Sequence, residues 1–355
     1  MKTSCFIFIV FFSGTMYCQQ LTELTIWKDS VMGAIYNKTT QSVAYNRPDK
    51  KGNYKIYISD TLGNNERSFT CPLWSNDRQQ WAEEWTPDGK FLFCYVEKTA
   101  YVKEEKHKRK PVDAVPGYGA YTDLWVISSD GKRFKKILDL PNNYNSGLIH
   151  AAISQDGKLF AWTERIKAPK FLNMNLAAGT YVFRVADIVY DSMPHFENVR
   201  TYVPGNVSAS GELDGISPDN TTLAFYSTFE TKNLFATPIY TLNMKSGAIK
   251  KLTAKSFAQA PTYIPAGNKL VYMTGDECKI FPLEIRGADW WLMDTTGENK
   301  RRLTFMNIKN HPHSVNHYRL AGTISFISDN SFLGGVMTKP LGLIGYTVKV
   351  RFFEK

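Results

Sequence analysis

The sequence predicts an all-β fold, a six-bladed β-propeller of four-stranded antiparallel blades that is closed by an N-terminal strand. A hairpin signature recurs along the chain, for example as WTPDGKFLFCYV at 85–96 and ISQDGKLFAWTER at 153–165. A second hairpin signature alternates with the first, and two hairpins in sequence make a four-stranded meander. Repeats of about 40–50 residues with four strands each are typical of a propeller. The 8 Trp, 19 Tyr and 22 Phe residues also suit many short packed strands.

The first hairpin is recognisable by its turn, which reads Thr86-Pro87-Asp88-Gly89 in the second blade. Proline has a fixed φ, aspartate accepts hydrogen bonds from nearby backbone amides, and glycine adopts the positive φ that a side chain resists. An apolar strand follows at once. Comparable first hairpins, the last of them degenerate, are NKTTQSVAYNR, EEWTPDGKFLFCYV, AAISQDGKLFAWTER, LDGISPDNTTLAFYS, PTYIPAGNKLVYMT and TISFISDNSFLGGVM.

The second hairpin places an aromatic or aliphatic pair before alternating residues, a glycine turn and basic residues. Its clearest copies are YKIYISDTLGNNERSF, TDLWVISSDGKRFKKIL, TPIYTLNMKSGAIKKLT and ADWWLMDTTGENKRRLT, with Gly63, Gly131, Gly247 and Gly297 at the turns. The third blade has a looser counterpart, TYVFRVADIVYDSM. The predicted blades are therefore 32–70, 78–140, 145–204, 207–254, 258–306 and 314–355.

The sixth blade shows only three clear strands, and it ends in GYTVKVRFF. A strand-like segment without a partner, LTELTIWK at 21–28, lies near the other end of the chain. We expect this segment to complete the sixth blade as its outermost strand. Such a closure ties the chain ends together and removes a sheet edge that would invite aggregation.

Both hairpin signatures resemble the repeat of the TolB-like six-bladed β-propeller family, a relative of the WD repeat. The residues that carry the resemblance are the Ser-Pro-Asp turns, as in ISPDNTTLAFYS, and second hairpins such as ADWWLMDTTGENKRRLT. The resemblance covers essentially the whole chain after residue 18. It implies the propeller fold, and roles in periplasmic protein binding, as the non-catalytic part of peptidases, or as the scaffold of carbohydrate lyases.

Residues 1–18, MKTSCFIFIVFFSGTMYC, have the layout of a secretory signal peptide: a lysine, an apolar run and then small residues. We therefore expect a single propeller domain over 19–355 in the periplasm or outside the cell. Lipid attachment at Cys18 is the alternative, which the bulky Tyr17 disfavours. A membrane-spanning helix needs about 20 apolar residues, and no later segment offers them, so we expect a chain that does not span the membrane.

The candidate ligand-binding residues lie near the start of the first strands. In a propeller these strands line the central channel, and residues just before them are expected at one channel mouth. Carboxylates and imidazoles gathered there can bind a ligand, hold a divalent cation or perform acid–base chemistry; they can also simply satisfy backbone groups and water. The residues are Glu83, Glu84, His150, Glu212, Asp214, Gln259 and His317.

No catalytic residue or metal ligand is assigned from the sequence. The segment NHPHSVNHY contains His311, His313 and His317, but no cysteine or nearby carboxylate completes a metal site. A nucleophile elbow, a phosphate-binding loop, a dinucleotide fingerprint and a His-Glu-x-x-His motif do not occur. The only cofactor to consider is therefore a divalent cation in the channel.

The formal net charge is +10, and basic residues cluster at 103–110, 132–136 and 300–302. These clusters lie at predicted turns and lack interleaved aromatic residues, so we do not expect nucleic-acid binding. Two insertions, 99–119 and 166–178, join second to third strands of adjacent blades and should project from the same face. Long loops on a rigid scaffold often carry binding.

These observations favour an exported, monomeric binding module that recognises a protein or glycan partner at the channel mouth and the two long loops. The alternative is an enzyme, a carbohydrate-active lyase or hydrolase built on the same ring. An enzyme would need an acid and a base that converge in the channel, which makes the positions of the candidate residues the discriminating observation.

Overall fold

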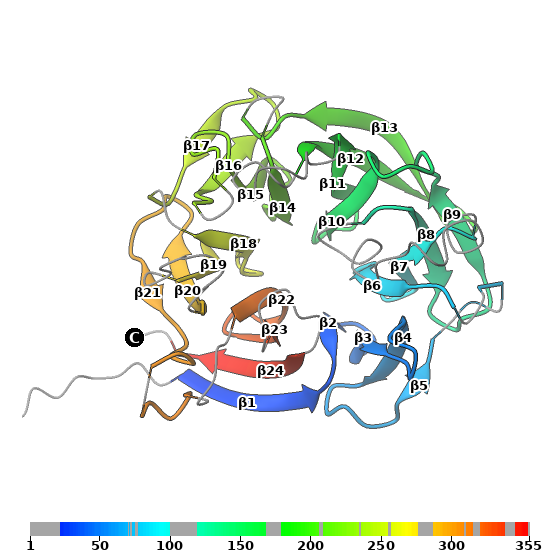
Figure 1. The fold of residues 1–355 in the computed structure, drawn as a ribbon, viewed down its shortest axis with the longest axis horizontal. Helices are drawn as coiled ribbons and strands as arrows, with labels where there is room; N and C mark the ends of the chain where they lie inside the picture. Colours follow the sequence, from blue (N-terminus) through cyan, green and yellow to red (C-terminus); the bar gives the residue numbers. More distant parts are fainter. Residues whose placement is uncertain are drawn as a thin grey trace, which may run out of the picture.

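The computed structural model describes residues 22–69, 71, 73–74, 77–99, 119–167, 179–205, 209–233, 236–254, 257–275, 287–308, 310–314, 320–337 and 345–353. These residues form six four-stranded antiparallel sheets arranged around a central axis (Figure 1). The predicted six-bladed propeller is thereby confirmed. The expected signal peptide, most of both long insertions and His317 lie outside the described residues.

Each blade runs from an inner strand to an outer strand. Blade 1 contains β2 (Met32–Asn37), β3 (Ser42–Pro48), β4 (Tyr54–Asp60) and β5 (Arg67–Ser68). Blade 2 contains β6 (Gln80–Trp85), β7 (Phe91–Glu97), β8 (Thr122–Ser128) and β9 (Phe134–Leu138). Blade 3 contains β10 (Gly147–Ile153), β11 (Leu159–Lys167), β12 (Thr180–Tyr190) and β13 (Pro194–Tyr202).

The second half of the ring repeats this order. Blade 4 contains β14 (Gly211–Ile216), β15 (Thr222–Ser227), β16 (Ile239–Asn243) and β17 (Ile249–Lys251). Blade 5 contains β18 (Ala258–Tyr263), β19 (Lys269–Thr274), β20 (Asp289–Asp294) and β21 (Arg301–Arg302). Blade 6 contains β22 (Leu320–Ser328), β23 (Ser331–Met337), β24 (Gly345–Phe352) and, outermost, β1 (Thr22–Asp29). Every predicted blade range contains the corresponding strands, apart from β1, which joins blade 6 from the other end of the chain.

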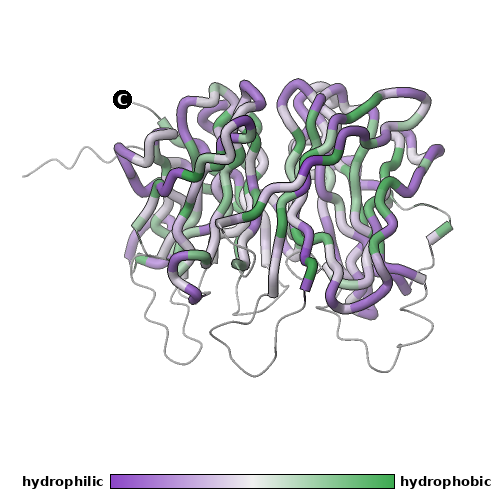
Figure 2. Tube along the Cα trace, turned by 90° about the horizontal axis from the view of Figure 1, so that it is seen from above, coloured by the Kyte–Doolittle hydropathy of each residue, from purple (hydrophilic) through white to green (hydrophobic). Residues whose placement is uncertain are grey.

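The recurring turn works as its residue types indicate. The Thr86 hydroxyl donates to Asp88 Oδ1 (2.7 Å), which also accepts from the backbone N–H of Lys90 (3.0 Å). Gly89 has φ +70°, and a Cβ there would lie 2.4 Å from Thr40 Cγ2 of the neighbouring blade. Glycine is therefore required both by the backbone conformation and by the close approach of the next turn. Seen edge-on, the hydrophilic turns lie mainly at the two faces of the ring (Figure 2).

The hydrophobic core is divided among the junctions between blades. Each of six apolar clusters joins two neighbouring blades. Between blades 2 and 3, for example, Phe93 packs on Phe160 with ring centroids 4.6 Å apart, and Phe196 packs on both rings. Among the described residues there is no helix with the length and hydropathy needed to cross a bilayer.

The N-terminal strand closes the ring as predicted. β1 pairs antiparallel with β24 from Thr22↔Phe352 to Asp29↔Tyr346, with a register shift after Ile26. Side chains of β1 also reach blade 1: Trp27 Nε1 donates to the Thr61 carbonyl (2.9 Å), and Lys28 pairs with Glu66 (3.0 Å). β1 therefore belongs to the sheet of blade 6 and is fastened by side chains to blade 1.

Deletion of residues 22–29 should destabilise the whole propeller, because it removes the outer strand of blade 6 and the contacts to blade 1 together. We expect the melting temperature to fall by well over 10 °C, or the chain to fail to fold. Circular dichroism melts of the truncated and full chains measure this. A truncated chain that melts at the wild-type temperature would show that closure by β1 does not stabilise the ring.

The Glu66 carboxylate should contribute to acid sensitivity at this closure. Burial acts to raise the pKa of Glu66, but hydrogen bonds from Tyr45, Lys28 and Arg47 lower it to about 2. Because this folded pKa lies below the unfolded value of about 4.3, the stabilisation is complete above that pH and is lost as the pH falls toward 2. Glu66→Gln should cost about 1–2 kcal/mol at neutral pH, allowing for solvent screening.

Urea denaturation of wild type and Glu66→Gln at a series of pH values measures this difference. The gap between the two proteins should narrow as the pH is lowered from about 7 to about 3. A gap that stays constant over this range would show that Glu66 acts through shape rather than charge.

Candidate functional site

The candidate residues lie within the inner strands and not ahead of them. Glu83 and Glu84 belong to β6, His150 to β10, and Glu212 and Asp214 to β14. Their expected position just before the first strands was therefore wrong. The inner strands begin earlier than their apolar residues indicate, because a strand wall that faces a wet channel accommodates polar side chains. The site is a section of the channel wall.

A β-bulge in the inner strands determines which side chains face the axis. In blade 2, Ala82 pairs with Cys94 and Glu84 with Phe93, so Glu83 is the extra residue. In blade 4, the extra residue is Asp214. The inner strands of the other four blades show a register shift in the same region. A bulge re-aims side chains without ending the strand, and here it presents carboxylates to the channel.

Three side chains from three consecutive blades meet at the centre. His150 Nδ1 lies 2.7 Å from Glu83 Oε1, and His150 Nε2 lies 3.5 Å from Asp214 Oδ1. Glu83 Oε1 also accepts a hydrogen bond from the backbone N–H of Ala151 (2.7 Å). Asp214 has a side chain only 3% exposed, and its Oδ2 has no hydrogen-bond partner among the described residues. His150 therefore joins blades 2, 3 and 4.

The electrostatics of this cluster keep its net charge low. Burial alone would lower the pKa of His150, but Glu83, and beyond it Asp214 and Glu212, raise that pKa to about 10. Burial and the neighbouring Glu83 raise the pKa of Glu84 to about 8, and burial raises the pKa of Asp214 well above its usual value. At neutral pH these shifts favour an imidazolium at His150 and uncharged carboxyl groups at Glu84 and Asp214.

Glu212 lies at the edge of this arrangement, whereas Gln259 is not part of it. Burial raises the pKa of Glu212, while a hydrogen bond with Tyr226 and the charge of His150 act to lower it. Gln259 lies half-buried on β18, and Thr262 rather than Gln259 lines the central cavity in that blade. The structure thus brings together Glu83, His150 and Asp214, with Glu84 and Glu212 nearby.

The space beside the cluster is small. A cavity of about 110 Å³ is lined by residues of all six inner strands, including Ala34, Glu83, His150, Asp214, Thr262 and Ser325. This volume suits a few water molecules and is below the roughly 300–1,000 Å³ of ordinary small-molecule sites. Across the part of the chain that the structure describes, no group of three or more His, Cys, Asp or Glu side chains is placed to hold a metal ion.

The histidine-rich segment serves the ring closure. His313 Nε2 donates to the Thr22 carbonyl at the start of β1 (2.8 Å). The ring of His311 stacks on Phe305 with centroids 4.5 Å apart and contacts the ring of His313. These contacts place two of the three histidines in a packing role beside β1.

A larger cavity of about 580 Å³ opens at the channel mouth on the face of the recurring turns. Turns from five blades line it through Lys38, Pro87, Gln155, Pro265 and Asp329, and aromatic side chains line it through Tyr36, Trp85, Tyr263 and Phe326. Glu84 and Ser325 border both this mouth cavity and the central cavity. The mouth therefore leads to the charged cluster.

The mouth cavity was not predicted from the sequence. Its turn residues were interpreted only as turn signals, although an aromatic residue just before several turns, such as Tyr36, Trp85 and Tyr263, marked the lining. In an antiparallel meander, second and third strands are joined at the face opposite these turns. The ends of β7, β8, β11 and β12 that adjoin the two long insertions therefore lie at the other face.

Glu84 should make the fold sensitive to alkaline pH. Its folded pKa of about 8 lies above the unfolded value of about 4.3. A raised pKa contributes stability that is fully present below the unfolded value and is lost as the pH rises through 8. Glu84→Gln places a neutral amide there and removes this loss. The variant should melt higher than wild type near pH 9, and the two should converge near pH 4.

Circular dichroism melts across this pH range measure the effect, with the exposed Glu298→Gln as a control that should follow wild type throughout. If Glu84→Gln melts below wild type near pH 9, a partner stabilises the Glu84 carboxylate, and its pKa is lowered rather than raised by the fold.

The fold is shared with proteins of known structure at low sequence identity. Over 90% of this chain it matches TolB from Acinetobacter baumannii, with a TM-score of 0.52 and 15% identity. Over 88% of this chain it matches a puromycin-hydrolyzing peptidase from Mycobacterium tuberculosis, with a TM-score of 0.52 and 14% identity. This chain spans 66% of the TolB chain and 42% of the peptidase chain.

No model of a known protein family matches the sequence, and no curated protein matches it. At identities of 15% and 14% the likeness concerns the fold alone. The chain is a six-bladed β-propeller similar in structure to TolB and to peptidase propellers.

Proposed function

We propose that this protein is an exported binding module that recognises a protein or glycan partner at the mouth of its central channel, on the face of the recurring turns. The observation that carries the proposal is the mouth cavity, whose volume of about 580 Å³ lies within the usual range for binding sites. Aromatic side chains beside polar turns suit both peptide and sugar surfaces, because they combine apolar contact area with hydrogen-bonding groups.

The rim of this cavity is held by hydrogen bonds between blades. Asn37 Nδ2 donates to the Thr86 carbonyl (2.9 Å), which joins blades 1 and 2. Gln155 Nε2 donates to the Pro265 carbonyl (3.0 Å), which reaches from blade 3 to blade 5. These contacts set the cavity shape before a partner arrives, and a preorganised site loses less conformational entropy on binding.

The rival function, a carbohydrate-active lyase or hydrolase, has one observation in its favour. His150 and Glu83 lie in contact, and carboxyl groups with raised pKa values surround them, an arrangement typical of active sites. The cavity beside them is only about 110 Å³, however, whereas the mouth cavity is about 580 Å³. A sugar bound in the mouth would stay outside the cluster, so binding is the better-supported function.

Export forms part of the proposal and rests on the signal-peptide layout of residues 1–18. An exported propeller meets envelope proteins and cell-surface glycans, the two partner classes named above. The chain is proposed to act as a monomer and without nucleic acid.

The proposal is tested by blocking the mouth. Gln155 is an exposed residue that lines this cavity, so Gln155→Trp should fill the entrance. The variant also loses the Gln155–Pro265 hydrogen bond, so its melting temperature is measured beside its binding. Lys245→Trp is the matched control, because Lys245 is an exposed turn residue on the outer part of the same face. Immobilised wild type and both variants are compared on a glycan array and with an envelope extract from the source cells.

We expect partner capture to fall at least about tenfold in Gln155→Trp and to be unchanged in Lys245→Trp. Equal capture by all three proteins would place recognition elsewhere. Turnover of a glycan by the wild type, measured as new reducing ends or unsaturated products, would favour the enzyme instead.

A further inference from the structure

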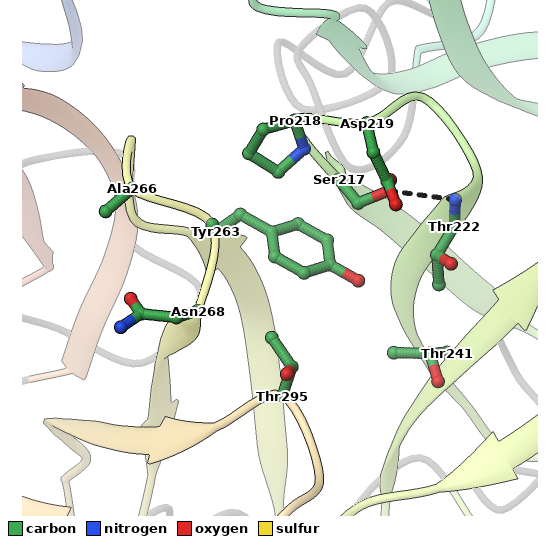
Figure 3. A pocket seen from close by; sticks show the side chains of 10 residues that line it. Ser217, Pro218, Asp219, Thr222, Thr241, Tyr263, Ala266, Asn268 and Thr295 are labelled. Carbon is green, nitrogen blue, oxygen red and sulfur yellow. Dashed lines mark hydrogen bonds between the residues drawn. The ribbon is translucent and has the colours of Figure 1, made fainter.

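A second pocket lies between blades 4 and 5 on the same face (Figure 3). It has a volume of about 500 Å³, and among the described residues Tyr263 is the one lining residue that it shares with the mouth cavity. Figure 3 shows the Tyr263 ring extending from blade 5, with its hydroxyl directed toward the blade 4 residues Thr222 and Thr241. Asn268 and Thr295 of blade 5 lie on the other side of the ring.

Two glycines give the pocket its shape. Gly267 has φ +79°, and a Cβ there would lie 2.7 Å from Pro218 Cγ, so glycine lets the blade 5 turn pack directly on the blade 4 turn. A Cβ on Gly215 would lie 3.2 Å from Tyr263 Cδ2, so Gly215 leaves room for the tyrosine ring. The two turns close one end of the pocket, and the ring is held in a fixed position beneath it.

The pocket presents hydroxyl groups that receive no hydrogen bond from the part of the chain that the structure describes. Tyr263 is 7% exposed and Thr241 is 9% exposed, and neither side-chain hydroxyl forms a hydrogen bond with any described residue. The Ser217 hydroxyl, by contrast, accepts from the backbone N–H of Thr222 (2.9 Å) and donates to Asp219 Oδ1 (2.5 Å). The hydroxyls of Tyr263 and Thr241 are therefore available to a ligand in the pocket.

The lining chemistry selects the class of ligand. Hydroxyl, amide and carboxylate groups line the pocket, and no Lys, Arg or His is among the lining residues. Hydrogen bonds from Ser217 and Thr221 lower the pKa of Asp219, so this exposed carboxylate is negative at neutral pH and repels anions. An apolar ligand would leave the hydroxyls unpaired. Ligand hydroxyls, which both donate and accept, match the protein hydroxyls.

We propose that the pocket between blades 4 and 5 binds a neutral saccharide unit of a glycan, with Tyr263, Thr241, Thr295, Asn268 and Asp219 as its polar contacts. This site lies beyond the proposed function, because its occupation does not depend on what binds in the mouth. One residue, Tyr263, borders both spaces, so a longer glycan bound in the pocket has a path toward the mouth.

The test uses isothermal titration calorimetry of the full chain with maltotriose, cellotriose and triacetylchitotriose, and with trigalacturonate as an acidic counterpart. We expect at least one neutral trisaccharide to bind and trigalacturonate to bind more weakly. Tyr263→Phe removes only the free hydroxyl, so it should keep the melting temperature and weaken binding about tenfold. Thr241→Val should act in the same direction.

Two tryptophan variants, one inside the pocket and one beside it, test where the trisaccharide binds. Thr295→Trp places a bulky ring in the pocket and should abolish binding, whereas Thr296→Trp adds the same ring to the next, exposed residue of the same turn and should not. Gln155→Trp, which blocks the mouth, should leave trisaccharide binding intact.

Three results would overturn the inference: none of the neutral trisaccharides binds wild type, Thr295→Trp binds them as well as wild type does, or trigalacturonate binds more tightly than they do. Loss of binding in Gln155→Trp with retention in Thr295→Trp would assign the saccharide to the mouth. That outcome would support the proposed function while rejecting this pocket.

Discussion

The pairing of β1 with β24 is the contact on which the rest of the structure depends. Among the described residues, the apolar cluster between blades 6 and 1 has five buried members, whereas the cluster between blades 5 and 6 has sixteen. The junction between blades 6 and 1 therefore buries fewer apolar side chains than the junction between blades 5 and 6, and it gains less stability from the hydrophobic effect. A hydrogen-bonded ladder and the Lys28–Glu66 pair supplement it. With the ring closed, six inner strands face one axis, and residues distant in sequence come into contact.

The central cluster follows from that closure together with the bulges. Glu83 and His150 are 67 residues apart in sequence, yet they touch because β6 and β10 are neighbours on the ring. A buried carboxylate is costly unless it is paired. Here the raised pKa of His150 favours an imidazolium beside Glu83, and the raised pKa values of Glu84 and Asp214 favour their uncharged forms. The polar cluster therefore joins blades 2, 3 and 4 by electrostatic contacts at the channel, beside the apolar clusters that pack between these blades.

Local chemistry explains what could be predicted from the sequence. The turn at Thr86–Gly89 is determined by residues within a few positions of one another, so its form and the hairpin count were accessible. The β1 closure was accessible because one strand lacked a partner and one blade lacked a strand. The bulge at Glu83 depends on which residue of β7 pairs with which residue of β6, and single-strand patterns do not contain that information. The mouth cavity combines turns from five blades, and its volume is a property of the assembled ring.

The recurring turn separates the residues that build the ring from those that line its cavities. In the turns of blades 2, 3 and 4, a Ser or Thr hydroxyl bonds to an Asp two residues later, and this pair holds the turn. The residue between them is free to vary, and it is Pro87, Gln155 and Pro218 in turn. Pro87 and Gln155 line the mouth cavity, and Pro218 lines the pocket between blades 4 and 5. Substitution at this middle position changes the lining of a cavity without disturbing the bond that forms the turn. One face of the ring thus carries both cavities, since the same turn presents a variable side chain to each.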